Sequence, residues 1–174
     1  MDIQRIRTEE QLRVNYLQSL GHCIKTAYGE EVLRLLDVKQ IDPTHFVTLM
    51  FNKNVSEPDC MSAYAVFLKL LSREVFGSHN KRRFIKQVTV LERHFNSSYH
   101  IHGLFECDVE TSKLPTSDHW KQTTKRLWSY KIKKGSRVGI SETKNYFIPI
   151  DDEDDLSRYV TKHFDNDGGQ LICL

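Results

Sequence analysis

Two runs rich in β-branched and apolar residues, 84–93 and 99–107, follow one another in the middle of the chain. Each run is typical of a strand. The turn-forming residues Asn96, Ser97 and Ser98 lie between them, and so short a connection joins neighbouring antiparallel strands. The sequence therefore predicts a β-hairpin and, with it, an antiparallel sheet.

Further helices and strands are expected on both sides of this hairpin. Apolar residues at helical spacing indicate helices, the first of them broken near Gly21 and Gly29, and β-branched runs indicate strands. The expected helices cover residues 3–37, 56–76, 117–130 and 151–164, and the other expected strands cover 45–51 and two short runs within 136–150. This order predicts an α+β fold, with a central antiparallel sheet of about five strands flanked by helices.

The length of the chain and a break in its pattern indicate how it is divided. Its 174 residues give room for one domain of ordinary size and a short appendage. Asp42 and Pro43 punctuate the chain after the first helical region. We therefore expect a helical N-terminal extension over 1–41 and the main domain over 42–174.

Apolar stretches and cysteine usage bear on where the protein works. The longest apolar stretches, such as 63–71, fall far short of the roughly 20 residues that a membrane span needs. Residues 1–10 are charged and lack the apolar core of an export signal. The cysteines at positions 23, 60, 107 and 173 form no C-x-x-C pair and are expected to be reduced core residues. We therefore expect a cytoplasmic protein with no membrane partner.

Positive charge is concentrated between residues 121 and 137, where no Asp or Glu occurs. Trp128 and Tyr130 lie within the same segment. Cations interleaved with aromatic rings suit a phosphate backbone with stackable bases, although a solvated helix face is the equally supported alternative. The cations, which are the candidate DNA-binding residues, are Lys121, Lys125, Arg126, Lys131, Lys133, Lys134 and Arg137.

A candidate metal site involves both strands of the predicted hairpin. His100 and His102 are two residues apart on the second strand, so both imidazoles face the same way and can bind one metal ion. Glu92, on the first strand, is expected near the positions opposite them, about 5 Å away at Cβ. Two imidazoles and a carboxylate leave open positions for substrate oxygens, which suits a Mn²⁺ or Mg²⁺ ion acting as Lewis acid on a phosphate. The alternative is that the histidines are structural and that Glu92 pairs with Arg93 or a lysine.

A second candidate pair, Tyr159 and Lys162, lies in the last expected helix. Residues three apart share a helix face, so the hydroxyl and the ammonium group can approach the same phosphate. Free tyrosine has a pKa of about 10, and a nearby cation would favour the reactive phenolate. The alternative is a core tyrosine beside a solvent-facing lysine. Tyr130 and Tyr146 are weaker candidates, because neither precedes a lysine by three on a convincing helix.

Together these motifs resemble those of the HUH endonuclease superfamily, where U is a bulky hydrophobic residue. Within it they most resemble the single-tyrosine replication initiators (Rep proteins) of rolling-circle plasmids and viruses. The apolar first motif is matched by residues 45–51, the H-U-H strand by 99–105 and the Y-x-x-K helix by 159–162. Glu92 matches the upstream acidic ligand of many members. The resemblance covers residues 42–165 and agrees in order, spacing and strand-or-helix context.

The resemblance implies that the main domain is an HUH endonuclease domain, a ferredoxin-like variant. His100, His102 and Glu92 would hold the divalent metal, Mn²⁺ or Mg²⁺. Tyr159 would attack a DNA phosphate and leave a 5′-phosphotyrosine link and a free 3′-hydroxyl, while Lys162 would position or neutralise the phosphate. The implied activity is site-specific nicking and joining of single-stranded DNA, which starts rolling-circle replication in the host cytoplasm. The implied partner is single-stranded or hairpin origin DNA; a host helicase, a polymerase and a second copy of the chain are further candidates.

Departures from related patterns leave alternatives open. Asp155 precedes Tyr159 by four, so the paired-tyrosine form Y-x-x-x-Y is absent, and strand termination needs a second subunit or another nucleophile. No GxxxxGK[ST] helicase motif occurs, so unwinding would need a partner. Histidine-triad hydrolases would need a histidine where Leu104 stands. A single-tyrosine HUH transposase and a non-catalytic DNA-binding module on the same scaffold stay open as alternatives.

Overall fold

The structure is a computed structural model of the chain. It describes residues 27–51, 55–78, 83–93, 98–108, 110, 112–132, 146–151 and 169–172. Within these ranges helices and an antiparallel sheet make an α+β fold, as the sequence predicts. No helix among the described residues is long and apolar enough to cross a membrane.

The sheet has the strand order β4-β1-β3-β2-β5, and every neighbouring pair is antiparallel. Strands β2 and β3 form the predicted hairpin, and β3 also pairs along its whole length with β1. The central strand β3 is therefore bonded on both sides. The strand bounds are His45–Met50 (β1), Gln87–Arg93 (β2), Tyr99–Phe105 (β3), Tyr146–Pro149 (β4) and Gly169–Ile172 (β5).

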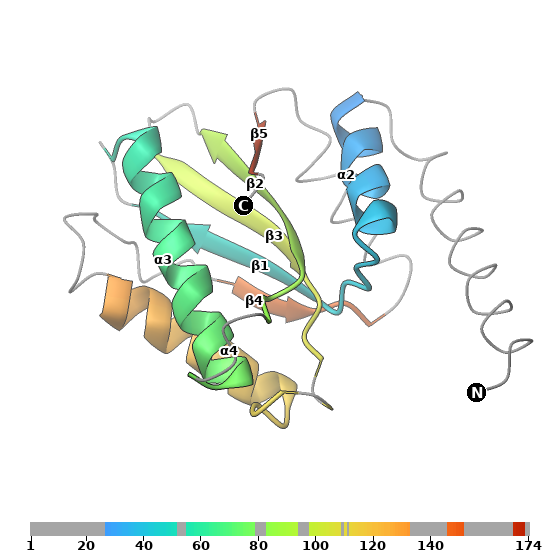
Figure 1. The fold of residues 1–174 in the computed structure, drawn as a ribbon. Helices are drawn as coiled ribbons and strands as arrows, with labels where there is room; N and C mark the ends of the chain where they lie inside the picture. The colour runs from blue at the N-terminus through green and yellow to red at the C-terminus, as the bar shows by residue number, and fades with distance from the viewer. Residues whose placement is uncertain are drawn as a thin grey trace, which may run out of the picture.

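One face of the sheet packs against α3 (Glu57–Phe76) and α4 (Ser117–Arg126), which continues as the π-helix η1 (Leu127–Ile132). Figure 1 shows these helices on one side of the sheet and α2 on the other. Side chains from alternate strand positions, such as Val47 and Ile101, meet the helices in the larger core cluster. Trp128 anchors η1 there, with its ring edge-on to Phe51 and Phe67 at centroid distances of 5.1 and 5.3 Å.

Helix α3 begins and ends where the sequence predicts. Ser56 is its N-cap, and the Ser56 hydroxyl oxygen accepts a hydrogen bond from the backbone N–H of Asp59. Gly77 ends the helix with a φ of 89°, a conformation that favours glycine. The helix expected over 56–76 is therefore confirmed.

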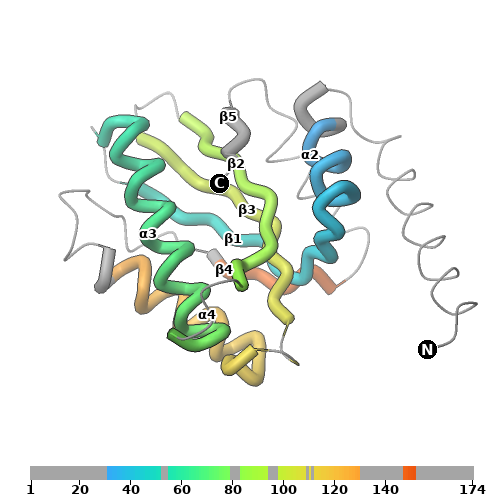
Figure 2. The backbone as a smooth tube through the Cα atoms, in the orientation of Figure 1, coloured from blue at the N-terminus to red at the C-terminus, as the bar shows by residue number. Residues whose placement is uncertain are grey.

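The other face of the sheet is covered in part by α2 (Ala27–Val38). Its apolar side chains, such as Val32 and Leu36, form a second core cluster with the even-numbered positions of β2 and β3, such as Val90 and Leu104. In Figure 2 the chain passes from α2 through a short connection into β1. The expected division at residue 41 stays a prediction, and α2 on its N-terminal side contributes to the core.

Several expected elements differ from the structure or lie outside it. β2 begins at Gln87 rather than at residue 84, and β5 was not predicted. Residues 3–26 of the first expected helix, residues 152–164 of the last expected helix and the first of the two short strands expected within 136–150 lie outside the described residues.

The two cysteines that the structure describes fit the sequence-based expectation. Cys60 and Cys107 are buried and form no disulfide. Burial raises the pKa of the Cys60 thiol to about 12, and burial also raises the pKa of Cys107. Both thiols are therefore protonated at neutral pH and unreactive.

Candidate metal centre

The β2–β3 hairpin brings the predicted metal ligands onto one face of the sheet. Glu92 is directly opposite His100 across the two strands, and His102 is two residues further along β3. The even-numbered positions of both strands carry these side chains toward the α2 side, while Ile101 packs into the core on the α3 side. The cross-strand placement of Glu92 that the sequence predicts is confirmed.

His102 is held on three sides. Its Nε2 lies 3.0 Å from Oε2 of Glu92, and its Nδ1 lies 3.1 Å from the hydroxyl oxygen of Thr48, the residue opposite it on β1. The ring also stacks on Phe46 at a centroid distance of 5.7 Å and an angle of 12°. Because only 4% of the residue is exposed, these contacts fix both the position and the orientation of the imidazole.

His100 lies beside this pair and is partly exposed. Its ring centroid is 6.1 Å from that of His102, and the two rings are inclined at 77°. Among the described residues, no three His, Cys, Asp or Glu side chains form a group that could hold a metal. The structure thus joins Glu92 and His102 directly, with His100 as a neighbour rather than a converging third ligand.

The donor set of these residues fits a divalent cation. Thr48 occupies Nδ1 of His102, which leaves Nε2 facing the Glu92 carboxylate, and a polar partner on the second nitrogen is usual for a metal-binding histidine. A cation bound between Nε2 and Oε2 would take the place of the hydrogen bond that joins them. His₂–carboxylate sites accept several divalent ions, and His100 would have to turn toward the pair to complete one.

The predicted nucleophile and its lysine, Tyr159 and Lys162, lie outside the described residues, and so do the basic residues Lys133, Lys134 and Arg137. For Lys131 the structure describes only the backbone, in η1. Their proposed roles therefore stay predictions.

The described part of the predicted basic segment lies away from the Glu92–His102 pair. Lys121, Lys125 and Arg126 are exposed on α4, which packs on the opposite face of the sheet. Arg126 pairs with Glu74 of α3 at 3.2 Å. These cations and the Glu92–His102 pair are therefore on different sides of the molecule.

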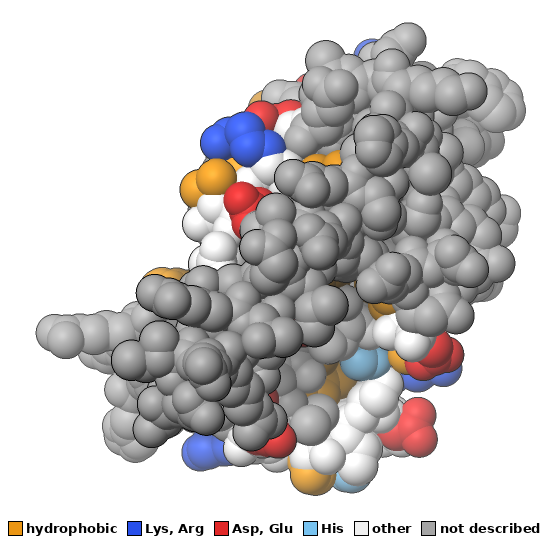
Figure 3. All heavy atoms as spheres, turned by 90° about the vertical axis from the view of Figure 1, so that its right-hand side faces the viewer, with side chains coloured by type: hydrophobic (Ala, Val, Ile, Leu, Met, Phe, Trp, Pro, Cys, Tyr) orange, Lys and Arg blue, Asp and Glu red, His pale blue; other side chains and the backbone are white. Residues whose placement is uncertain are grey.

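Figure 3 shows the α2 side of the molecule. On the described part of this face, Lys and Arg side chains lie apart from one another and close to acidic ones. On α2, Arg34 pairs with Glu31 at 2.6 Å. The described side chains of this face thus form no continuous basic surface.

Two polar contacts were not predicted from the sequence. The first is Thr48 behind His102; a polar residue in an otherwise apolar run was the only available signal. The second lies on the other face, where Nε2 of His45 is 2.6 Å from the hydroxyl of Ser117 and its Nδ1 is 2.9 Å from that of Thr44. His45 is buried, and this burial lowers its pKa from 6.5 to about 4, with a small opposing effect of Asp151. A neutral His45 therefore ties the start of α4 to β1.

Comparison with protein-family models, curated proteins and solved structures finds no match to this chain.

Proposed function

We propose that the protein is a metal-dependent, site-specific endonuclease for single-stranded DNA, of the HUH type with one catalytic tyrosine. It would start the rolling-circle replication of a plasmid or virus. The observation that carries the proposal is the contact between Glu92 and His102, whose Oε2 and Nε2 atoms are 3.0 Å apart. Glu92 lies on β2 directly opposite His100, the first histidine of the H-U-H motif on β3. The proposal joins this contact to the H-U-H and Y-x-x-K motifs of the sequence.

The residues of the centre have separate tasks in this proposal. Glu92, His102 and His100 bind the divalent cation, which when bound supplies a Lewis acid for the scissile phosphate. Thr48 and Phe46 hold the His102 ring in place, so this ring needs little reorganisation to bind a cation, whereas His100 would have to turn toward it. Glu92 keeps about a fifth of its side chain exposed (20%), which leaves it reachable by a cation from solvent.

Tyr159 and Lys162 carry the covalent chemistry in the proposal. The phenolic oxygen of Tyr159 forms a bond to the phosphorus of a DNA phosphodiester, and the bond from phosphorus to the 3′-oxygen breaks. The phenol loses one proton and the 3′-oxygen takes one up, so protons balance, and the strand stays linked through its 5′-phosphate to the tyrosine. Lys162 offsets negative charge on the phosphate. The linkage preserves the bond energy, so the reverse attack by a 3′-hydroxyl rejoins the strand.

A nicking assay tests this proposal. The protein is incubated with labelled single-stranded oligonucleotides, including hairpins from the DNA that flanks its gene, with Mn²⁺ and with or without a chelator. We expect cleavage that needs Mn²⁺. The rate should fall at least about a hundredfold in His102→Ala, because the substitution removes a buried ligand together with its contacts to Glu92 and Thr48. His119→Ala is the matched control, since His119 is exposed on α4.

The same assay separates the alternatives. Nicking that His102→Ala and His119→Ala leave equally intact would contradict the metal centre. Cleavage confined to transposon ends would favour the single-tyrosine transposase. DNA binding without cleavage would favour the non-catalytic module.

A further inference from the structure

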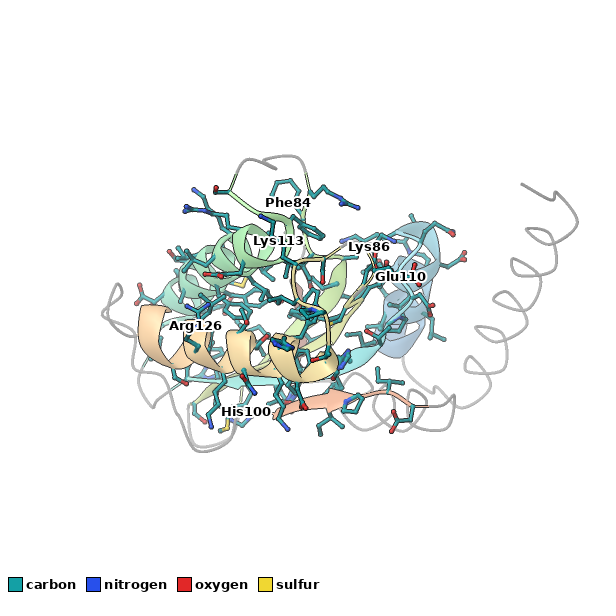
Figure 4. The ribbon with its side chains drawn as sticks, turned by 90° about the horizontal axis from the view of Figure 1, so that it is seen from below. Phe84, Lys86, His100, Glu110, Lys113 and Arg126 are labelled. Carbon is teal, nitrogen blue, oxygen red and sulfur yellow. The ribbon has the colours of Figure 1, made fainter. Side chains whose placement is uncertain are left out.

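A pocket of about 880 Å³ lies between α3 and the residues that lead into β2. Its size falls within the range of small-ligand sites. Gln87, in the pocket wall, faces α3, whereas Glu92 faces the α2 side, so this α3–β2 pocket and the metal centre are on opposite faces of the sheet. Figure 4 shows Phe84 of the pocket on one side of the molecule and His100 on the other.

The lining of the α3–β2 pocket is positively charged. Lys69 and Arg73 are one helical turn apart on α3, and Arg83 approaches from the strand side, with its guanidinium 5.0 Å from the centre of the Phe76 ring. Among the lining residues that the structure describes there is no Asp or Glu. In the described part of the chain none of the three cations forms an ion pair. The pocket therefore favours an anionic ligand.

An aromatic ring stands at the same pocket. Phe84 lines it and is 70% exposed, the most exposed of the large hydrophobic side chains that the structure describes. It does not contribute to either core cluster. Such a ring can stack against another flat ring, and a nearby cation strengthens that contact. The combination suits a ligand that carries both a planar ring and a negative group.

A chain of buried hydroxyl groups orients a polar group in the pocket wall. The Thr89 hydroxyl donates to Oε1 of Gln87, so the Tyr64 hydroxyl, 2.7 Å from Thr89, must donate to Thr89. Tyr64 and Thr89 are fully buried, and Gln87 is 6% exposed. The Thr89 hydroxyl occupies one lone pair of the Gln87 oxygen, and the amide N–H groups of Gln87 are donors that a ligand could use. A hydrogen-bond acceptor on the ligand would suit them.

We propose that the α3–β2 pocket binds one nucleotide of single-stranded DNA. The phosphate lies against Lys69, Arg73 and Arg83, the base stacks on Phe84, and an acceptor atom of the base edge receives a hydrogen bond from Gln87. A base in a duplex is already paired and stacked, whereas an unpaired base can turn toward an exposed ring. The choice of DNA over a free nucleotide rests on the proposed function. In that setting the pocket is an accessory contact, which holds a strand segment away from the site of cleavage.

Binding measurements test the pocket independently of cleavage. Fluorescence anisotropy with a labelled short oligonucleotide is measured without metal, on folded full-length variants checked by thermal melting. We expect Phe84→Ala to weaken binding by on the order of tenfold through lost stacking and Phe84→Trp to restore it. Val38→Ala, an equally simple change of an exposed apolar residue on α2, should have no effect.

The salt dependence tests the phosphate contacts. Because one phosphate contacts all three cations, Lys69→Ala and Arg73→Ala should each reduce the slope of log K against log salt concentration by a part of the roughly 0.7 expected for one phosphate contact on a single strand. Lys39→Ala, at an exposed position outside the pocket, should leave the slope unchanged. Equal effects of Lys39→Ala and Arg73→Ala would overturn the proposal.

Two further results separate this proposal from the proposed endonuclease. Photo-crosslinking with a 5-iodouracil oligonucleotide should label the peptide that contains Phe84; labelling elsewhere alone, or tighter binding of ATP than of the oligonucleotide, would overturn the assignment to DNA. Loss of binding in Phe84→Ala, with no nicking under any condition, would uphold the pocket and reject the endonuclease. If the protein nicks DNA but Phe84→Ala leaves oligonucleotide binding unchanged, the endonuclease would be upheld and the pocket rejected.

Discussion

A single buried contact defines the candidate metal centre at the scale of residues. His102 is almost completely buried, and water therefore cannot compensate for a missing partner. Glu92 and Thr48 satisfy its two ring nitrogens, each from a different neighbouring strand. The orientation of this imidazole is thus a property of three strands and not of the H-U-H motif alone.

Thr48 is predicted to position His102 for metal binding. In Thr48→Val the hydroxyl is lost with little change of shape, so the His102 ring is less well oriented. We expect Mn²⁺ affinity, measured by isothermal titration calorimetry, to fall about 10- to 100-fold. Thr48→Ser should restore most of it. A variant that melts like the original protein and binds Mn²⁺ equally well would contradict this role.

His45 is predicted to make the fold sensitive to acid. Its pKa is about 4 in the folded protein and 6.5 when it is exposed. Between these values the unfolded chain takes up a proton that the folded chain does not, so stability falls as pH decreases from 6.5 toward 4. The loss at pH 4 amounts to about 3 kcal/mol.

Urea unfolding at a series of pH values measures this effect. His45→Gln cannot titrate, so the difference between the two proteins isolates His45 from the carboxylates that titrate in both. Between pH 6.5 and 4 the free energy of unfolding should fall more steeply with decreasing pH in the original protein than in His45→Gln. Parallel curves over that interval would show that His45 is not buried in its neutral form.

Local pattern made some of these residues predictable and left others unpredictable. The position of Glu92 followed from hairpin pairing, because register depends on residues close in sequence. The contact of His45 with Ser117 joins residues 72 apart and depends on how α4 packs. The contact of Thr48 with His102 required the knowledge that β1 lies beside β3. The alternation of apolar and polar residues along a strand does not reveal which strands are neighbours in the sheet.

The central strand β3 illustrates constraint at the scale of an element. A methyl group on Gly103 would lie 2.5 Å from a ring carbon of Phe105 and 3.2 Å from the Thr89 hydroxyl. Phe105 is fully buried and cannot move aside. We expect Gly103→Ala to destabilise the fold by about 1–3 kcal/mol, measured by urea unfolding.

A double-mutant cycle checks the cause. Phe105→Leu removes the ring carbons that the new methyl group would meet. Gly103→Ala should therefore lower the free energy of unfolding by less in the Phe105→Leu protein than in the original protein. An unchanged cost would mean that the strain has another origin. Whichever variant is used, the hairpin itself should persist, because its turn is unaltered.

Elements with strong local signals were predictable, and those defined by their partners were not. The helix α3 carries a cap, a stop and a regular apolar stripe, and its bounds followed from them. β5 covers only Gly169–Ile172 and exists through its pairing with β2. The conversion of α4 into a π-helix at Leu127 also lacks a local signal; it accompanies the burial of Trp128 between Phe51 and Phe67.

At the scale of the whole molecule, the two faces of the sheet differ in character. The α2 side carries Glu92 and His102, while the α3 side carries the α3–β2 pocket and the described cations of α4. A DNA strand that contacts both faces must pass around an edge of the sheet. We expect long single strands to bind more tightly than short ones, and double substitution of Phe84 and Arg73 to remove that advantage; gel-shift titration of a length series measures it.

Mass spectrometry of a covalent protein–DNA product tests the central claim most directly. The protein is incubated with its cleaved oligonucleotide and Mn²⁺, digested with trypsin and nuclease, and searched for a nucleotide on tyrosine. We expect a 5′-phosphotyrosine at Tyr159 that is absent with chelator, in Tyr159→Phe and in His102→Ala. A nucleotide on Tyr130 or Tyr146 instead, or cleavage without any covalent product, would contradict it.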